Sequence, residues 1–116
     1  MKIHKIINLV AFENTYILEN NQGLLVVDPG SDWKKIERKL EELAKPVIAI
    51  LLTHTHYDHI MSLEKVREHY AAPPVYVAES ESSWLYTPTD NLSGLARHAD
   101  MDDIICRPAE EFFSYE

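Results

Sequence analysis

Four side chains that bind divalent metals well fall within residues 54–59. They are His54, His56, Asp58 and His59, and they follow the apolar run 47–52 almost directly. Loops that follow strands often carry the chemistry of a fold. His54 and His56 are two residues apart, so in an extended backbone both imidazoles leave the same side and can share one ion.

Asp58 and His59 come where the chain must turn, and we expect them to aim at a second point close to the first. Neutral imidazole suits zinc, and a carboxylate adds a hard oxygen that suits zinc, iron or manganese. Histidines are common at loop entrances, so a pair two residues apart would need no comment. Four ligands at this spacing after a buried strand indicate a metal site or its remnant.

The segment 53–59 resembles the His-x-His-x-Asp-His signature of the metallo-β-lactamase superfamily. Upstream, residues 23–30 resemble the family's strand that ends in Asp-Pro-Gly, and residues 14–16 resemble its early Asn-x-Tyr strand. The chain is most similar to the small bacterial, glyoxalase-II-like members. The resemblance covers nearly the whole chain, but only the N-terminal half of the family's domain.

This resemblance implies an α/β fold, an αββα sandwich of which residues 1–116 form about one half, as a single domain with one mixed sheet and outer helices. By the same resemblance, His54 and His56 would hold a first metal ion, and Asp58 and His59 a second. Asp58 would also orient the nucleophile and take up its proton. Asp28 would orient the metal loop by hydrogen bonds rather than bind metal itself.

The chemistry implied is metal-dependent hydrolysis. A bound divalent ion lowers the pKa of its water from about 15.7 toward roughly 7, which makes hydroxide available at neutral pH. We expect zinc, as one or two ions, with iron or manganese as alternatives, and a small-molecule ester or thioester substrate such as an acyl-glutathione. The alternative is a truncated, catalytically inactive remnant that binds metal or serves only a structural role.

The family's downstream ligands have no counterpart in residues 60–116, where His98 lacks the expected Pro-Gly context and is not expected to bind metal. At most two protein ligands per ion are then available from one chain, so metal binding should be weak or incomplete. The apolar inner face of the sheet lacks its usual partner sheet. We therefore expect a homodimer through that face, since soluble proteins rarely expose large apolar patches.

Composition excludes several partners. With 11 basic and 19 acidic residues the net charge is −8, which argues against nucleic acid and anionic membranes. No apolar run is long enough to span a bilayer. The single cysteine, Cys106, cannot form an internal disulfide and is expected to be a reduced, structural thiol, so we expect a cytoplasmic protein.

Periodicity predicts the elements that position these residues. Residues 32–44 should form a helix whose apolar stripe runs from Trp33 to Leu43, with Ser31 or Asp32 as its N-cap and Pro46 preventing its continuation. We expect strands at residues 2–10, 14–19, 24–27, 47–52 and 75–77, helices at 62–70 and 80–85, a loop at 87–94, and terminal strands around 104–105 and 112–113.

Three groups of side chains remain to be assigned by the sequence. Trp84, Tyr86 and Leu92 either line a substrate pocket or, more commonly for aromatics in this number, belong to the core. His4 and His69 should be exposed. Met61 replaces a small residue that the family usually has after the metal motif, which puts close backbone packing there in question.

Overall fold

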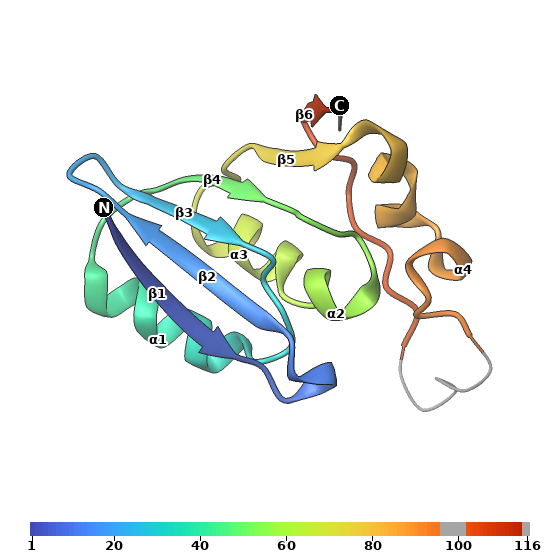
Figure 1. Cartoon of the computed structure of the whole chain (residues 1–116), viewed down its shortest axis with the longest axis horizontal. Helices are drawn as coiled ribbons and strands as arrows, with labels where there is room; N and C mark the ends of the chain where they lie inside the picture. The colour runs from blue at the N-terminus through green and yellow to red at the C-terminus, as the bar shows by residue number, and fades with distance from the viewer. Residues whose placement is uncertain (96–101, 115–116) are drawn as a thin grey trace.

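The structure, a computed structural model, describes residues 1–95 and 102–114. One six-stranded mixed sheet has helices on one face (Figure 1). The strands are β1 (Lys2–Ile7), β2 (Asn14–Glu19), β3 (Leu24–Val27), β4 (Val47–Leu51), β5 (Val75–Ala78) and β6 (Glu111–Phe113). The helices are η1 (Val10–Phe12), α1 (Trp33–Leu43), α2 (Tyr57–Ile60), α3 (Leu63–His69), η2 (Glu79–Tyr86) and α4 (Pro88–Asn91).

The strands lie in the sheet in the same order as in the chain. The pairs β1–β2 and β2–β3 are antiparallel, because short turns join these strands. The pairs β3–β4, β4–β5 and β5–β6 are parallel, and α1 and α3 form the first two crossovers. The carboxyl ends of β3 and β4 therefore meet at one edge of the sheet, which is where residues 53–59 begin.

The core lies between the sheet and its helices. Ile17, Val26, Ile50 and Val75 are paired neighbours across four strands, so they share one face, and all are fully buried. The predicted stripe of α1 supplies Ile36 and Leu40 to this core, with Trp33 and Leu43 packed at its margin. The α3 side chains Leu63 and Val66 complete it. Burying each such aliphatic side chain stabilises the fold by about 1.5–3 kcal/mol.

The opposite face of the sheet carries an apolar row with no helix over it in the described part of the chain. Ile3, Leu18, Leu25 and Ala49 are paired neighbours across β1 to β4. Ile48 lies beside them around a shallow depression of about 300 Å³. We call these five residues the open face. Ile3 is 65% exposed and Ile48 48% exposed, so the face is accessible to a partner.

The start of α1 differs from the sequence prediction. Asp32 occupies the N-cap position, but neither it nor Ser31 makes a side-chain capping bond. The Asp32 carboxylate accepts a hydrogen bond from the Leu9 N–H instead, and the Ser31 hydroxyl accepts one from the Val10 N–H. Both side chains therefore fix the η1 segment to the helix. At the other end, Ala44 takes a left-handed conformation before Pro46, as expected for a helix stop.

Other expectations need smaller corrections. The first strand ends at Ile7, because the chain turns into η1, and residues 88–91 of the predicted loop form α4. Residues 104–105 form no strand, whereas Glu111–Phe113 does. His4 is half-buried against Glu19 rather than exposed, while His69 is exposed as expected. His98 lies outside the described residues. None of the helices described is long and apolar enough to cross a membrane.

Candidate metal centre

Residues 53–59, the metal loop, leave β4 at the carboxyl end of the sheet and enter the short helix α2. In this loop the imidazole rings of three predicted ligands lie close to one another. The His54 and His59 ring centroids are 5.2 Å apart in an edge-to-face arrangement, and those of His54 and His56 are 6.4 Å apart and nearly parallel. Asp58 joins them, with its Oδ2 atom 3.5 Å from His59 Nε2.

The two nitrogen atoms of the His59 ring have different neighbours. Its Nε2 atom faces Asp58, beside the other loop histidines. Its Nδ1 atom faces inward, 3.1 Å from Asp28 Oδ2 and 3.4 Å from Glu13 Oε2. Nε2 is therefore the atom that remains for a metal ion in the loop, while Nδ1 belongs to the protein interior.

Asp28 follows β3 directly and joins it to the metal loop. Its Oδ1 atom accepts a hydrogen bond of 2.7 Å from the Thr53 N–H, and its Oδ2 atom accepts one from the Thr53 hydroxyl. Its own backbone has a left-handed φ of 53°, and its carbonyl accepts the Thr15 hydroxyl at 2.7 Å. The carboxylate thus lies beneath the start of the loop and beside His59, the position that the predicted orienting role requires.

Glu13 is a site residue that the sequence did not predict. Its side chain is only 2% exposed and comes from the turn before β2. The Asn8 amide donates to Glu13 Oε1 at 2.8 Å, and the Oε2 atom has no hydrogen-bond partner. In residues 1–95 and 102–114, one group of three metal-ligating side chains has its atoms within 4.8 Å of one another: Glu13, Asp28 and His59. The loop residues 54, 56 and 58 are not part of it.

The electrostatics of this cluster follow from its burial and charges. Burial, together with the carboxylates of Asp28 and Asp58, raises the pKa of Glu13 to about 9. Burial alone would lower the pKa of His59, but Asp28 and Asp58 outweigh it and raise that pKa above its ordinary value. The cluster therefore concentrates negative charge that a proton or a cation can offset.

The segment η2 supports the loop from the other side. The Trp84 and His56 rings stack with centroids 5.3 Å apart and planes 7° from parallel. Glu81 accepts a 3.0 Å hydrogen bond from the Thr55 N–H, and the Thr55 hydroxyl is also bonded to Glu81. Of the two expectations for Trp84, pocket or core, neither describes it fully, because it packs on a predicted ligand.

Residues just after the loop pack closely despite Met61. Ser62 is buried, its N–H donates to the Pro29 carbonyl at 3.0 Å, and its hydroxyl donates to the Gly30 carbonyl. The backbone after α2 therefore meets the Asp-Pro-Gly turn directly. Met61 is half-buried and does not prevent this contact.

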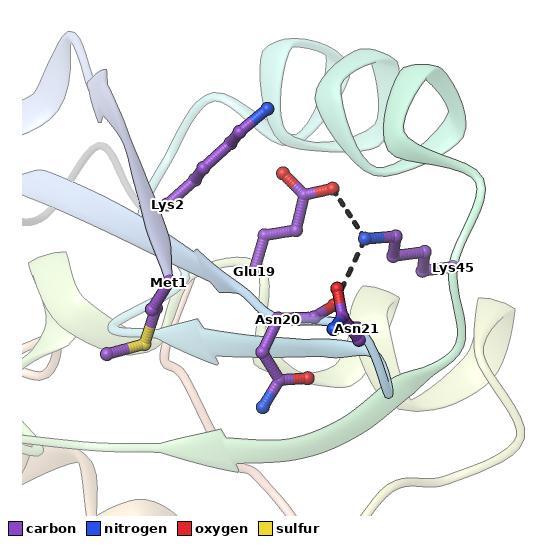
Figure 2. A pocket seen from close by; sticks show the side chains of 6 residues that line it. All are labelled: Met1, Lys2, Glu19, Asn20, Asn21 and Lys45. Atoms are coloured by element: carbon purple, nitrogen blue, oxygen red, sulfur yellow. Dashed lines mark hydrogen bonds and ion pairs between the residues drawn. The ribbon is translucent and has the colours of Figure 1, made fainter.

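A polar pocket of the described chain lies away from this loop. It has a volume of about 280 Å³ and lies at the opposite end of the sheet, between the start of β1, the β2–β3 turn and Lys45 (Figure 2). Its main charged groups are already paired, since Lys45 binds Glu19 at 2.9 Å and donates to the Asn20 carbonyl at 3.0 Å. It has no metal-ligand grouping, so the chemistry belongs at the metal loop.

The donor set fits a divalent metal ion. Imidazole and carboxylate are the groups that zinc and iron prefer, and the His59 ring presents one nitrogen to the loop while the other faces carboxylates. Carboxylate contacts of this kind are typical of metal-binding histidines. Among the residues that the structure describes, the Glu13 Oε2 and His59 Nδ1 atoms have no hydrogen-bond partner, so the cluster has polar atoms left over for a further ligand.

The chain belongs to the metallo-beta-lactamase superfamily, whose family model matches residues 9–111. It is 57% identical over 113 residues to a probable metallo-hydrolase of Streptococcus pyogenes serotype M6, covering 97% of this chain and 49% of that protein. The resemblance expected from residues 14–16, 23–30 and 53–59 is confirmed.

More distant relatives carry more specific names. A hydroxyacylglutathione hydrolase of Klebsiella pneumoniae is 36% identical over 74 residues, which cover 61% of this chain and 29% of that protein. A probable polyketide biosynthesis zinc-dependent hydrolase of Bacillus subtilis, PksB, is 33% identical over 85 residues, which cover 72% of this chain and 37% of that protein. The chain spans about half the length, or less, of the curated relatives it matches.

Solved structures confirm the fold class. The crystal structure of the BLEG-1 B3 metallo-beta-lactamase superposes with a TM-score of 0.84 at 30% identity, covering 99% of this chain and 54% of that one. The structure of TTHA1623 in a di-iron-bound form gives 0.71 at 25% identity, covering 97% of this chain and 54% of that one. The expectation of one mixed sheet with outer helices, about half of a metallo-β-lactamase fold, is therefore correct.

Proposed function

We propose that this chain carries half of the active site of a metal-dependent hydrolase that acts on a small ester or thioester, of the hydroxyacylglutathione hydrolase kind. The observation that carries the proposal is the two-sided His59 ring, with Nε2 beside Asp58 and the rings of His54 and His56 nearby. The names of the Klebsiella and Bacillus relatives support a thioester substrate and zinc.

The chain's own residues would divide the work. His54 and His56 would hold one ion, and Asp58 and His59 a second, while Asp58 would orient the attacking water and accept its proton. A bound divalent ion supplies Lewis acidity and lowers the pKa of the water it binds. Zinc is our choice of metal, with iron or manganese as alternatives, the first of these supported by a neighbour with a di-iron form.

Metal binding by this chain alone should be weak. The loop offers at most two protein ligands per ion, whereas catalytic zinc sites usually have three and structural ones four. Calorimetric titration of the chain with Zn²⁺ tests this. We expect binding that His54→Ala and His59→Ala each weaken, and that the exposed control His69→Ala leaves unchanged. Tight stoichiometric zinc in a monomeric sample would contradict the expected weakness, and zinc binding unaffected by both loop variants would contradict the site.

Turnover tests the hydrolase itself. With the chain loaded with Zn²⁺, release of free thiol from an acyl-glutathione thioester should be slow, should require the metal and should fall in Asp58→Asn. Thiol release that is equally fast without metal would contradict the proposal. Metal binding without any turnover would favour the second candidate, a catalytically inactive metal-binding remnant, which is supported by the limit of two loop ligands per ion.

We further propose that the open face binds a second copy of the chain. Ile3, Leu18, Leu25, Ile48 and Ala49 form an apolar row, and no helix of residues 1–95 and 102–114 lies over it. A two-fold dimer would bury this row and bring two metal loops into one particle, with up to twice the ligands of one chain.

A further inference from the structure

The first strand of the sheet, β1, has a free edge. The strand order places β1 at one end of the sheet, where it pairs with β2 on one side, and α1 lies behind it (Figure 1). Between the two lies a groove of about 340 Å³, which we call the edge groove. The helix contributes Lys35, Arg38, Lys39 and Glu42 to its lining, and the strand contributes residues 5–7.

The outward backbone groups of β1 belong to its odd-numbered residues. Hydrogen-bonded and non-bonded pairs alternate along an antiparallel ladder. The Asn8 N–H donates to the Glu13 carbonyl at 2.8 Å, directly after the last register pair of β1 and β2, so even-numbered residues turn toward β2. Residues 3, 5 and 7 then direct their N–H and C=O groups away from the sheet. Ile7 agrees with this alternation, because its carbonyl accepts Lys35 Nζ from α1 at 3.3 Å.

Just beyond β1, the chain itself places an acidic group along this side. The N–H of Leu9, two residues after Ile7, donates to the Asp32 carboxylate at 3.0 Å. The same carboxylate oxygen lies 3.3 Å from Lys35 Nζ. One position therefore already shows a carboxylate that accepts a backbone N–H beside a basic side chain of α1. In residues 1–95 and 102–114, no strand or side chain pairs with the outward backbone of residues 3 and 5.

The charge of the edge groove is opposite to that of the whole chain. The chain has a net charge of −8, yet three basic side chains of α1 line this one groove and Lys5 adds a fourth from β1. Lys35 and Lys39 have acidic neighbours on α1 at 3.3 and 2.7 Å. Arg38 and Lys5 have no ion pair within the part of the chain that the structure describes. Positive charge therefore remains for a partner.

Basic residues on an edge strand also limit which partner can add to it. Two copies of β1 that met edge to edge would bring like charges together, which disfavours that pairing. An acidic strand meets no such repulsion. The charge of the edge thus selects against a second β1 and in favour of an acidic segment.

We propose that β1 and the edge groove bind an extended acidic segment of a partner protein, which adds to the sheet as a further strand about 4.8 Å from β1. Its backbone pairs with the outward groups of residues 3 and 5. Its acidic side chains face Arg38 and the neighbouring lysines of α1, and its alternate, apolar side chains extend the open face beside Ile3. This inference does not depend on the proposed hydrolase function.

The test uses a short, end-blocked peptide of alternating glutamate and valine, titrated into the ¹⁵N-labelled chain. We expect the amides of Ile3 and Lys5 to shift and to exchange more slowly with solvent, because they become paired. Two further peptides separate charge from strand pairing. One has lysine in place of each glutamate, and the other has alternate backbone nitrogens methylated, so that it cannot pair. Both should bind at least tenfold more weakly.

A matched pair of variants on α1 tests the groove. Arg38→Glu should weaken peptide binding about tenfold, because an exposed ion pair contributes up to about fivefold and the reversed charge adds repulsion. Lys34→Glu makes the same change of charge at an exposed position of the same helix outside the groove lining, and it should leave binding unchanged. The peptide comparison on the unchanged chain does not depend on whether either variant folds.

Three results would overturn the proposal. Equal binding of the acidic peptide and its methylated form would show charge attraction without strand addition, and equal affinities in the two variants would exclude the edge groove. Inorganic phosphate that shifts Arg38 while the acidic peptide does not bind would mark a small-anion site instead. Protection of the Ile3 and Lys5 amides that rises with protein concentration, without peptide, would assign the edge to a second copy and would also overturn it.

Discussion

Trp84 stacks flat on His56, with ring centroids 5.3 Å apart and planes 7° from parallel. The contact joins η2 to the metal loop and fixes the plane of the His56 imidazole, which we propose binds metal. The other tryptophan, Trp33, lies 5.0 Å from His69 with planes 50° apart and offers a comparison within the same chain.

Trp84→Leu should weaken metal binding by up to about tenfold, because aromatic pairs contribute roughly 0.5–1.5 kcal/mol beyond their area. Calorimetric titration with Zn²⁺ measures this, with Trp33→Leu as the matched control at the other tryptophan–histidine pair. Equal affinities in the two variants would show that the stack does not position His56.

Glu81→Ala should loosen the start of the metal loop without unfolding the chain. Glu81 accepts the Thr55 N–H at 3.0 Å, and loss of this acceptor leaves a buried donor unpaired, at a cost of about 1–3 kcal/mol. Hydrogen exchange at the Thr55 amide should become faster, while Glu79→Ala, an exposed glutamate of the same helix, should leave it unchanged. Unaltered hydrogen exchange at the Thr55 amide in Glu81→Ala would show that the Glu81 hydrogen bond does not hold the start of the metal loop.

The stability of the chain should depend on pH through Glu19. Hydrogen bonds from Lys45 and His4 lower the pKa of Glu19 from 4.5 to about 2. The folded chain therefore favours the charged form, so the contribution is complete above pH 4.5 and is lost as pH falls toward 2. Glu19→Gln should lower the urea midpoint at neutral pH, and its difference from the unchanged chain should shrink over that acid range.

Glu68→Gln, at an exposed position of α3, is the control for this pH series. It should follow the unchanged chain at every pH. A Glu19→Gln difference that stays constant from neutral to acid would show that the pair in Figure 2 contributes through packing rather than charge.

The open face should hold a dimer together. Ile48→Lys places a charge in the apolar row and should convert the dimer to a monomer, because an unpaired buried charge is costly. Ile105→Lys changes another apolar residue, 66% exposed, and should leave assembly unchanged. Light scattering at micromolar concentration measures both, and a stable monomer of the unchanged chain would refute the dimer.

The sequence predicted the elements whose hydrophobic pattern is strong. Residues 24–27 form β3 as expected, and the predicted helix 32–44 differs from α1 by one residue at each end, because Ile36 and Leu40 define its buried stripe. The predicted strand before the metal motif is present as β4, and it ends at the edge of the sheet where the motif begins. These features depend on residues that are close together in the chain, so the sequence is enough to predict them.

Contacts between distant segments could not be predicted in the same way. Ser31 and Asp32 have good capping chemistry, but the η1 turn competes for their oxygens. Glu13 reads as an ordinary turn residue, and only the folded sheet places its carboxylate beside His59.

Asp28 illustrates a compromise between local stability and chemistry. Its φ of 53° is a conformation that costs most residues about 1–2 kcal/mol, and glycine would adopt it without that cost. Glycine, however, has no carboxylate to receive Thr53 or to face His59. Aspartate and asparagine are the residues that tolerate this backbone and still have a polar side chain. Selection of this chain for heat resistance alone should therefore favour replacement of Asp28. The chemistry of the site opposes that replacement.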